Sequence, residues 1–286
     1  MLWLLPNAPR WPDGPRSQFE EIVSTSGEVA KQAGNRTTLR FLAQGRAFFL
    51  KIHTGIGWHE IFKNLLMGKM PVLGAGVEWT ALQAVRALGI HTVTPAGYGS
   101  QGLNPARQRS FLLTEDLGES VTLESLLMAW AGLERLSQKE LRLKRELIRG
   151  TAQLIKRLHA HSLIHRDLYL CHIRIRIADL ANHVQDGCPP LYLMDLHRTQ
   201  VRTFRRTRWI VKDLGSLYFS ALHIGLSKQD RFRFIREYAL RPLREELCGE
   251  GLWKRVGDRA MKTKQLPLAQ TKEPAGSECR SNATIG

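Results

Sequence analysis

Residues that can carry acid–base chemistry stand together in the segment LIHRDLYLCHI, residues 163–173. His165, Arg166 and Asp167 follow an apolar run, and His172 comes shortly after the aspartate. A loop carboxylate can orient and deprotonate an acceptor hydroxyl, and phosphoryl transfer needs few other protein groups. The same aspartate could equally be a turn or cap residue, so its meaning depends on the rest of the chain.

The other groups that phosphoryl transfer needs have one candidate each. Lys51 ends the strand-like segment AFFLKIH, where a lysine can bind nucleotide phosphates. Glu78 opens the next helical pattern and could form the ion pair that positions Lys51. Asp195 follows the apolar letters LYLM and could bind Mg²⁺. Taken alone, Lys51 could be a charge at a strand edge, Glu78 a favourable acid in the first turn of a helix, and Asp195 an acid in the turn after a strand. Their order, together with the letters HRD, favours a kinase-like fold.

Three features depart from the protein-kinase pattern. No GxGxxG precedes the strand lysine, and the turn before it offers only Gly34, so backbone amides with Arg36 or Thr37 are expected to hold phosphate instead. His172 stands where kinases carry asparagine, and imidazole is a poorer Mg²⁺ ligand than a carbonyl oxygen. Asp195 is not followed by Phe-Gly.

The elements that must position these residues can be read from periodicity. Residues 37–53 predict two strands joined at a Gln-Gly-Arg turn, and residues 77–88 predict a helix ended by Gly89. A longer helix over 139–161 carries an apolar stripe of helical period. Two short apolar segments, RSFLLTEDL and PPLYLMDL, predict further strands, and helical patterns follow to about residue 256.

Strands that lead and helices that follow predict an α+β fold with two lobes. We expect a small β-rich N-lobe over residues 18–117 and a larger helical C-lobe over 118–263. Residues 1–17 are proline-rich and are expected to be an irregular lead-in, and the polar, aperiodic residues 264–286 a disordered tail.

Composition limits the partners and the compartment. Lys and Arg outnumber Asp and Glu by 42 to 26, a formal charge of +16, which favours an anionic partner. The four cysteines show no CxxC pair and predict reduced thiols in a cytosolic protein. The apolar start is too short for a signal peptide, and no apolar run is long enough to cross a bilayer. Any membrane contact is therefore expected to be peripheral.

The chain resembles the lipopolysaccharide core heptose(I) kinases (the WaaP or RfaP family). The resemblance lies in the segments FFLKIHTGIGWHEIFKNLLMGKMPVLGAGVEW, HRDLYLCH, MDLHR and WIVKDLGSLYFSALHIGLS, and it covers about residues 36–256. The histidine at 172 and the letters DLHR after the strand are what that family shows in place of the usual kinase letters.

The resemblance implies a protein-kinase-like fold and a kinase that uses ATP and Mg²⁺. Family members phosphorylate a hydroxyl of the first heptose of the lipopolysaccharide inner core, at the cytoplasmic face of the Gram-negative inner membrane. By position, the resemblance implies Asp167, in the letters HRD with His165 and Arg166, as the catalytic base, and Lys51 as the phosphate-binding lysine with Glu78 as its partner. It implies Asp195 as the metal ligand, with His172 in the place of the second, and the backbone around Glu115 to Leu117 as the hinge that holds adenine. Arg36 and Thr37, at the turn before the strand lysine, complete the expected nucleotide-binding residues.

The resemblance also suggests where the excess of basic residues acts. The segment 198–212 corresponds to a kinase activation segment and carries no acid. An inner-core acceptor carries acidic sugars and lipid A phosphates, which arginines suit. The expected acceptor-binding residues are Arg202, Arg205, Arg206 and Arg208. Further expected partners are the lipid-linked acceptor itself, the anionic inner-membrane surface and an acidic protein.

Other classes of function fit less well. A nucleic-acid-binding protein would show a recognition motif or a basic stripe with interleaved aromatic residues, and the sequence has neither. A related kinase that acts on another core sugar such as Kdo, or on a small-molecule hydroxyl, would share the fold and the ATP chemistry. A pseudokinase is disfavoured by the retained Lys51, Glu78, Asp167 and Asp195.

Overall fold

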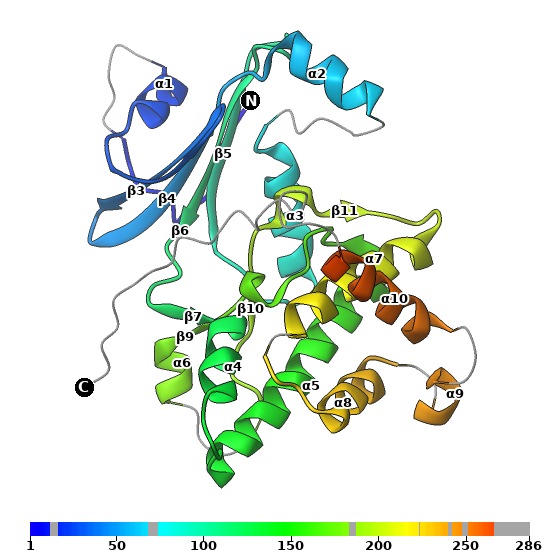
Figure 1. Cartoon of the computed structure of the whole chain (residues 1–286). Helices are drawn as coiled ribbons and strands as arrows, with labels where there is room; N and C mark the ends of the chain where they lie inside the picture. The colour runs from blue at the N-terminus through cyan, green and yellow to red at the C-terminus, as the bar shows by residue number, and fades with distance from the viewer. Residues whose placement is uncertain are drawn as a thin grey trace.

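The chain folds into a β-rich part and a helical part (Figure 1). The structure, a computed structural model, describes residues 1–11, 17–67, 74–182, 187–222, 224–239, 242–247 and 251–265. In the β-rich part, six antiparallel strands form one sheet in the order β1-β5-β6-β4-β3-β2. Their bounds are β1 Leu2–Leu4, β2 Glu28–Ala33, β3 Arg36–Ala43, β4 Arg46–His53, β5 Pro95–Gln101 and β6 Arg109–Glu115.

Alternation along β4 gives the sheet two different faces. Phe48 and Leu50 are fully buried on the face covered by α1 (Gln18–Val23). Lys51 points to the other face, toward α3 (Gly76–Ala87), which a hydrogen-bonded contact described below confirms. The predicted hairpin between β3 and β4 is confirmed, with Gln44 and Gly45 both at positive φ in its turn.

Two predicted boundaries need correction. Residues 1–17 are not an irregular lead-in throughout, because Leu2–Leu4 form β1 and pair with β5 at the edge of the sheet. The sequence analysis could not predict β1, because its three residues pair with a strand that lies far along the chain and no local pattern shows this. The tail predicted from residue 264 begins inside α10 (Leu252–Gln265), and its remainder lies outside the described residues.

The helical part contains the long helix that the sequence predicts. This helix is α5, Gln138–Ala160, and it begins with a capping box between Ser137 and Glu140. Among the described residues, no helix is both long and apolar enough to cross a membrane. The remaining elements are α2 Gly57–Leu66, β7 Ser120–Thr122, α4 Leu123–Ala131, β8 Leu163–Ile164, η1 Leu170–His172, β9 Ile173–Arg176, α6 Ile177–Ala181, β10 Tyr192–Leu193, η2 Leu196–Arg198, β11 Gln200–Val201, α7 Arg206–Ala221, α8 Lys228–Tyr238 and α9 Leu243–Leu247.

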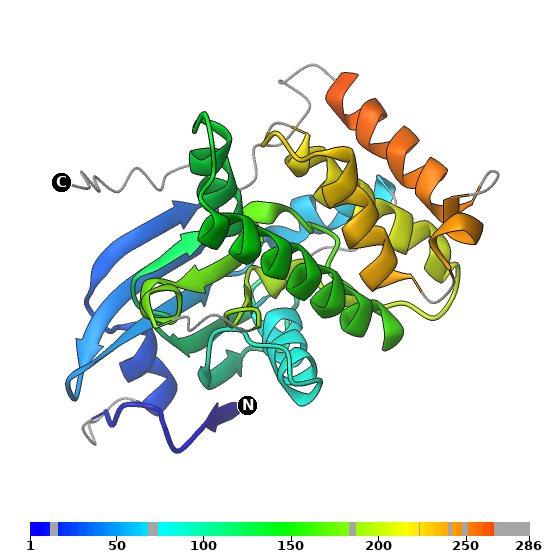
Figure 2. The ribbon, with the colours of Figure 1, turned by 90° about the horizontal axis from the view of Figure 1, so that it is seen from below.

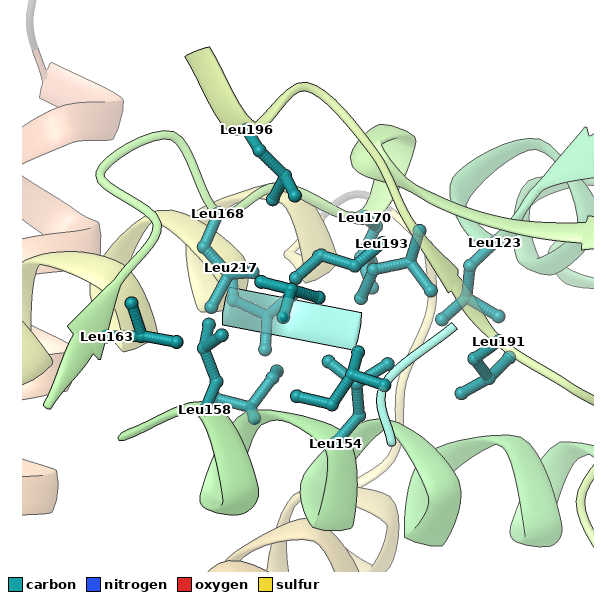
Figure 3. Packing of buried hydrophobic residues seen from close by; sticks show 14 of the residues in the cluster. Leu123, Leu154, Leu158, Leu163, Leu168, Leu170, Leu191, Leu193, Leu196 and Leu217 are labelled. Atoms are coloured by element: carbon teal, nitrogen blue, oxygen red, sulfur yellow. The ribbon is translucent and has the colours of Figure 1, made fainter. Parts of the chain in front are cut away.

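One apolar core lies between α5 and the short elements above it (Figure 3). Leu154 and Leu158 of α5 face Leu163, Leu168 and Leu170, which come from the segment that begins with β8. In a second view, α5 runs beneath the small β7–β9–β10 sheet, and α10 lies at the outer edge beside α7 (Figure 2). The predicted α+β architecture with a β-rich N-lobe and a helical C-lobe is confirmed.

The last residue of β4, His53, is buried, and its Nε2 atom has no hydrogen-bond partner among the described residues. Burial lowers its pKa from the usual 6.5 to about 4, and the charges of Arg36, Lys51 and His197 add to this, against the opposing effect of Glu78. The folded state therefore binds fewer protons than the unfolded state between these pH values. The stabilisation from neutral His53 is complete above pH 6.5 and is lost as the pH falls toward 4.

We expect wild-type protein to lose more stability than His53→Gln between pH 7 and pH 4.5. The difference in unfolding free energy between the two proteins should change by roughly 2–3 kcal/mol over this range. Urea unfolding at both pH values measures it. A difference that does not depend on pH would show that His53 titrates normally in the folded protein.

Candidate active site

A lysine–glutamate pair joins the sheet to α3. Lys51 Nζ donates a hydrogen bond to Glu78 Oε1 at 2.5 Å. Glu78 is 3% exposed, and its Oε2 has no partner among the described residues. A buried carboxylate that holds one ammonium hydrogen fixes the direction of the other two, so Lys51 is oriented for an anion. The pairing predicted from the sequence is thus present.

The loop with the letters HRD is held by one buried carboxylate, Asp213 of α7. Its Oδ2 accepts the backbone N–H of His165 at 2.7 Å, and its Oδ1 accepts the N–H of Arg166 at 2.8 Å. His159 Nε2 lies 3.3 Å from the same carboxylate. Arg166 has a φ of 72°, a left-handed conformation that costs energy for a residue with a Cβ. Asp213 stabilises this turn and so fixes the direction in which Asp167 leaves it.

The His165 side chain ties the loop to the segment before Asp195. Its Nε2–H donates to the Met194 carbonyl at 2.9 Å, because a carbonyl oxygen can only accept. The ring is fully buried, and burial lowers the pKa of His165, which keeps the ring neutral. His165 and Arg166 therefore support the loop that carries Asp167.

The Asp167 carboxylate is bound by an arginine that the sequence analysis missed. Arg198 Nη1 lies 2.9 Å from Oδ1 and 2.8 Å from Oδ2. Arg198 belongs to η2, which begins directly after Asp195, so the two aspartates are linked through one short segment. The letters DLHR could have pointed to Arg198, because they place an arginine three residues after Asp195.

His172 and Asp195 face each other and can share a divalent cation. His172 Nδ1–H donates to the Asp167 carbonyl at 2.7 Å, which leaves the lone pair of a neutral ring on Nε2. This Nε2 lies 3.6 Å from Asp195 Oδ2. Among the described residues, no three His, Cys, Asp or Glu side chains form a metal cluster. Two protein ligands, completed by nucleotide phosphates and water, are the usual arrangement for Mg²⁺.

Asp195 is oriented for this role by its own neighbours. Its backbone is left-handed, with a φ of 59°, and its Oδ1 accepts a hydrogen bond from His197 Nδ1. Burial alone would raise its pKa, but the hydrogen bond from His197 and the charges of His197, Lys51 and His172 hold the pKa well below its usual range. The carboxylate therefore stays ionised, with Oδ2 directed at His172.

The strand register separates the two residues expected at the phosphate turn. Arg36 pairs with His53 and shares the face of Lys51, whereas Thr37 pairs with Ile52 and points to the opposite face. Thr38, which pairs with Lys51, brings a hydroxyl to the face where Thr37 was expected. The strict alternation of a strand was the signal that could have distinguished these two threonines.

At the expected hinge, the Glu115 side chain is already bound. Its Oε1 accepts hydrogen bonds from Asn7 Nδ2 at 3.0 Å and from Arg46 Nη1 at 2.9 Å. The N–H groups of Glu115 and Asp116 also donate, to the Thr94 and Ala47 carbonyls, so both are already in use at the expected hinge. The partner Asn7 comes from the segment after β1, which was not foreseen.

The four expected acceptor-binding arginines do not act as one group. Arg202, Arg205 and Arg208 line a cavity of about 300 Å³ with Trp209 at its wall, and the Arg202 guanidinium lies 4.8 Å from the centre of the Trp209 ring. Arg206 points elsewhere and donates to the His159 carbonyl at the end of α5. Among the described residues, none of the four is paired with Asp167 or Glu78.

Comparisons with known proteins agree with this geometry. The profile of the lipopolysaccharide kinase (Kdo/WaaP) family matches residues 20–238. A Pseudomonas aeruginosa protein named lipopolysaccharide core heptose(I) kinase WaaP is 43% identical over 235 residues, which are 82% of this chain and 85% of that protein. An Escherichia coli protein of the same name is 38% identical over 257 residues, 90% of this chain and 94% of that protein.

A solved structure is similar as well. It is described as WaaP in complex with acyl carrier protein, and it superimposes with a TM-score of 0.70 at 36% sequence identity. The match covers 86% of this chain and 92% of that chain. The resemblance found in the sequence and the protein-kinase-like fold are both confirmed. The chain belongs to the lipopolysaccharide kinase (Kdo/WaaP) family and is accordingly an ATP-dependent phosphotransferase that acts on a sugar hydroxyl.

Proposed function

We propose that this kinase transfers the γ-phosphoryl group of ATP to a hydroxyl of the first heptose in the lipopolysaccharide inner core. The observation that carries the proposal is the proximity of four residues in a chain whose relatives are named heptose(I) kinases: the charge of Lys51 acts on Asp195, Asp195 faces His172, and His172 is hydrogen-bonded to Asp167. The family description also names Kdo, so a Kdo hydroxyl is the alternative acceptor.

Each group in the cleft has a separate task. Lys51, held by Glu78, binds the nucleotide phosphates, and the backbone of Glu115 to Leu117 holds the base. Asp195 Oδ2 and His172 Nε2 would hold Mg²⁺, which would neutralise charge on the phosphate oxygens. Asp167 accepts the proton of the sugar hydroxyl. Because Arg198 contacts both oxygens of Asp167, the acceptor hydroxyl must share this carboxylate with a guanidinium.

The partners follow from charge. An acidic acyl carrier protein is the partner of the similar WaaP structure, and a formal charge of +16 suits this chain for the same kind of partner. The same charge supports peripheral contact with an anionic membrane surface, where a lipid-linked acceptor resides. We place the protein at the cytoplasmic face of the inner membrane on this basis.

The proposal is tested by incubating the purified protein with ATP, Mg²⁺ and an inner core that lacks heptose phosphate. Mass spectrometry of the fragmented product should locate one added phosphate on the first heptose. Asp167→Asn should reduce transfer about 100-fold or more, because proton acceptance is lost. Its nucleotide affinity, measured by calorimetry, should stay near that of wild type. Phosphate found on Kdo would show that Kdo, and not the heptose, is the acceptor. Transfer at the wild-type rate by Asp167→Asn would show that Asp167 is not the base.

The arginine cavity makes a second prediction. Replacing Arg202, Arg205 and Arg208 by Gln should raise KM for the lipid-linked acceptor several-fold and leave KM for ATP unchanged. Added salt should bring the wild type toward the variant, since screening acts over about 8 Å at physiological ionic strength.

A matched control removes the same charge elsewhere. Arg135, Arg142 and Arg145 are exposed residues around the start of α5, and their replacement by Gln should leave both KM values unchanged. Equal effects of the two triple variants would mean that net charge, and not the cavity, attracts the acceptor. Arg206→Gln should instead lower the thermal midpoint, because it removes a donor at the end of α5.

A further inference from the structure

Helix α2 presents apolar side chains to the solvent. Trp58, Phe62, Leu65 and Leu66 are 50%, 57%, 49% and 90% exposed, and their spacing puts them on one side of the helix. Ile61, at the edge of the same side, is 5% exposed and attaches the helix to the protein. A surface helix of a globular protein normally buries its apolar stripe, whereas here all of the stripe except Ile61 is left exposed. Figure 1 shows α2 at the upper edge of the sheet, extending to the side on which α3 lies.

One more exposed apolar residue lies in the loop that is hydrogen-bonded to the start of α2. Gly57 N–H donates to the Ala106 carbonyl at 3.0 Å, which attaches the helix to the loop between β5 and β6. A Cβ on Gly55 would lie 2.2 Å from the same carbonyl, so the close contact depends on glycine there. Leu103, in this loop, is completely exposed. We call Trp58, Phe62, Leu65, Leu66 and Leu103 the α2 surface.

The charges around the α2 surface are mainly positive. Lys63 and Arg107 are exposed beside it. The one acid of α2, Glu60, is bound by Lys63 Nζ at 3.4 Å and by Asn64 Nδ2 at 3.1 Å. Trp58 and Phe62 stack with their ring centres 5.8 Å apart. Tryptophan, phenylalanine and leucine on one side of a helix, flanked by cations, are typical of a helix that lies in the interface of an anionic bilayer.

We propose that the α2 surface docks the kinase onto an anionic lipid bilayer. The proposal rests on the proposed function, since an acceptor linked to lipid is reached only at a membrane. The position in the chain fits this role, because α2 is inserted between β4, which carries Lys51, and α3, which carries Glu78. Helix α2 thus follows the strand of Lys51 after a short connection.

The test compares two variants in vesicle binding. The double variant Trp58→Ser, Phe62→Ser removes both rings, and both positions are exposed, so folding should be retained. Leu42→Ser is the control, because Leu42 is 73% exposed and lies at the opposite end of the sheet, beside the β3–β4 turn. Full-length protein is co-sedimented with vesicles of phosphatidylcholine, with and without phosphatidylglycerol.

Wild type and Leu42→Ser should bind the phosphatidylglycerol vesicles equally, and the double variant about tenfold or more weakly. Trp58 fluorescence should shift to the blue when vesicles are added. The double variant should phosphorylate a delipidated, soluble inner core at the wild-type rate and a bilayer-embedded acceptor more slowly.

Equal vesicle binding by wild type and the double variant overturns the proposal. Absence of vesicle binding together with a dimer that the double variant loses, seen by sedimentation, also overturns it and makes a second copy the occupant of α2. Failure of the proposed function looks different. In that case the wild type does not phosphorylate even the soluble inner core, while the vesicle binding and its dependence on Trp58 and Phe62 persist.

Discussion

The hydrogen bonds that Asp213 accepts determine the geometry of the whole site. This carboxylate is 1% exposed, and it binds the N–H groups of His165 and Arg166 from a different part of the chain. A buried charge is costly unless it is fully hydrogen-bonded, so the loop and α7 hold each other in place. Leu163, Leu168 and Leu170 fix the same loop into the core from below (Figure 3). Asp167, which Arg198 binds, and His172, whose Nδ1 donates to the Asp167 carbonyl, extend from the loop that is held in this way.

The second constraint aligns the two lobes. The segment after α3 is bound to β10, because Thr92 Oγ1 donates to the Leu193 carbonyl at 2.6 Å and Leu193 N–H donates to the His91 carbonyl at 2.9 Å. Leu193 stands two residues before Asp195. Helix α3, which carries Glu78, is therefore linked to the carboxylate that faces His172. Lys51 and Asp195 come from different lobes. This contact holds the two lobes together, so that the charge of Lys51 acts on Asp195.

Local sequence patterns predicted the residues of this site and the contact of Lys51 with Glu78, but not the other contacts that hold the site together. Lys51, Glu78 and Asp195 lie at the ends or starts of elements whose periodicity is strong, so they could be placed. Asp213 could not, because the letters KDLGSLY show an acid in a helix but not which helical face is buried or what approaches it. Thr37 was expected at the phosphate turn, but the register with β4, which the sequence does not show, pairs Thr38 with Lys51. The pairing of β1 with β5 likewise joins residues far apart in the chain.

This site departs most from the general kinase pattern at His172, which stands where other kinases carry an asparagine. The hydrogen bond from Nδ1–H to the Asp167 carbonyl leaves Nε2 directed toward Asp195, so one cation contacting both residues is the central expectation. Pulsed electron paramagnetic resonance of Mn²⁺ bound with a non-hydrolysable ATP analogue measures this directly. The wild type should show the ¹⁴N coupling of a directly bound imidazole, and His172→Gln should lose it while still binding Mn²⁺ through Asp195. No nitrogen coupling in the wild type, or the same coupling in His172→Gln, would contradict it.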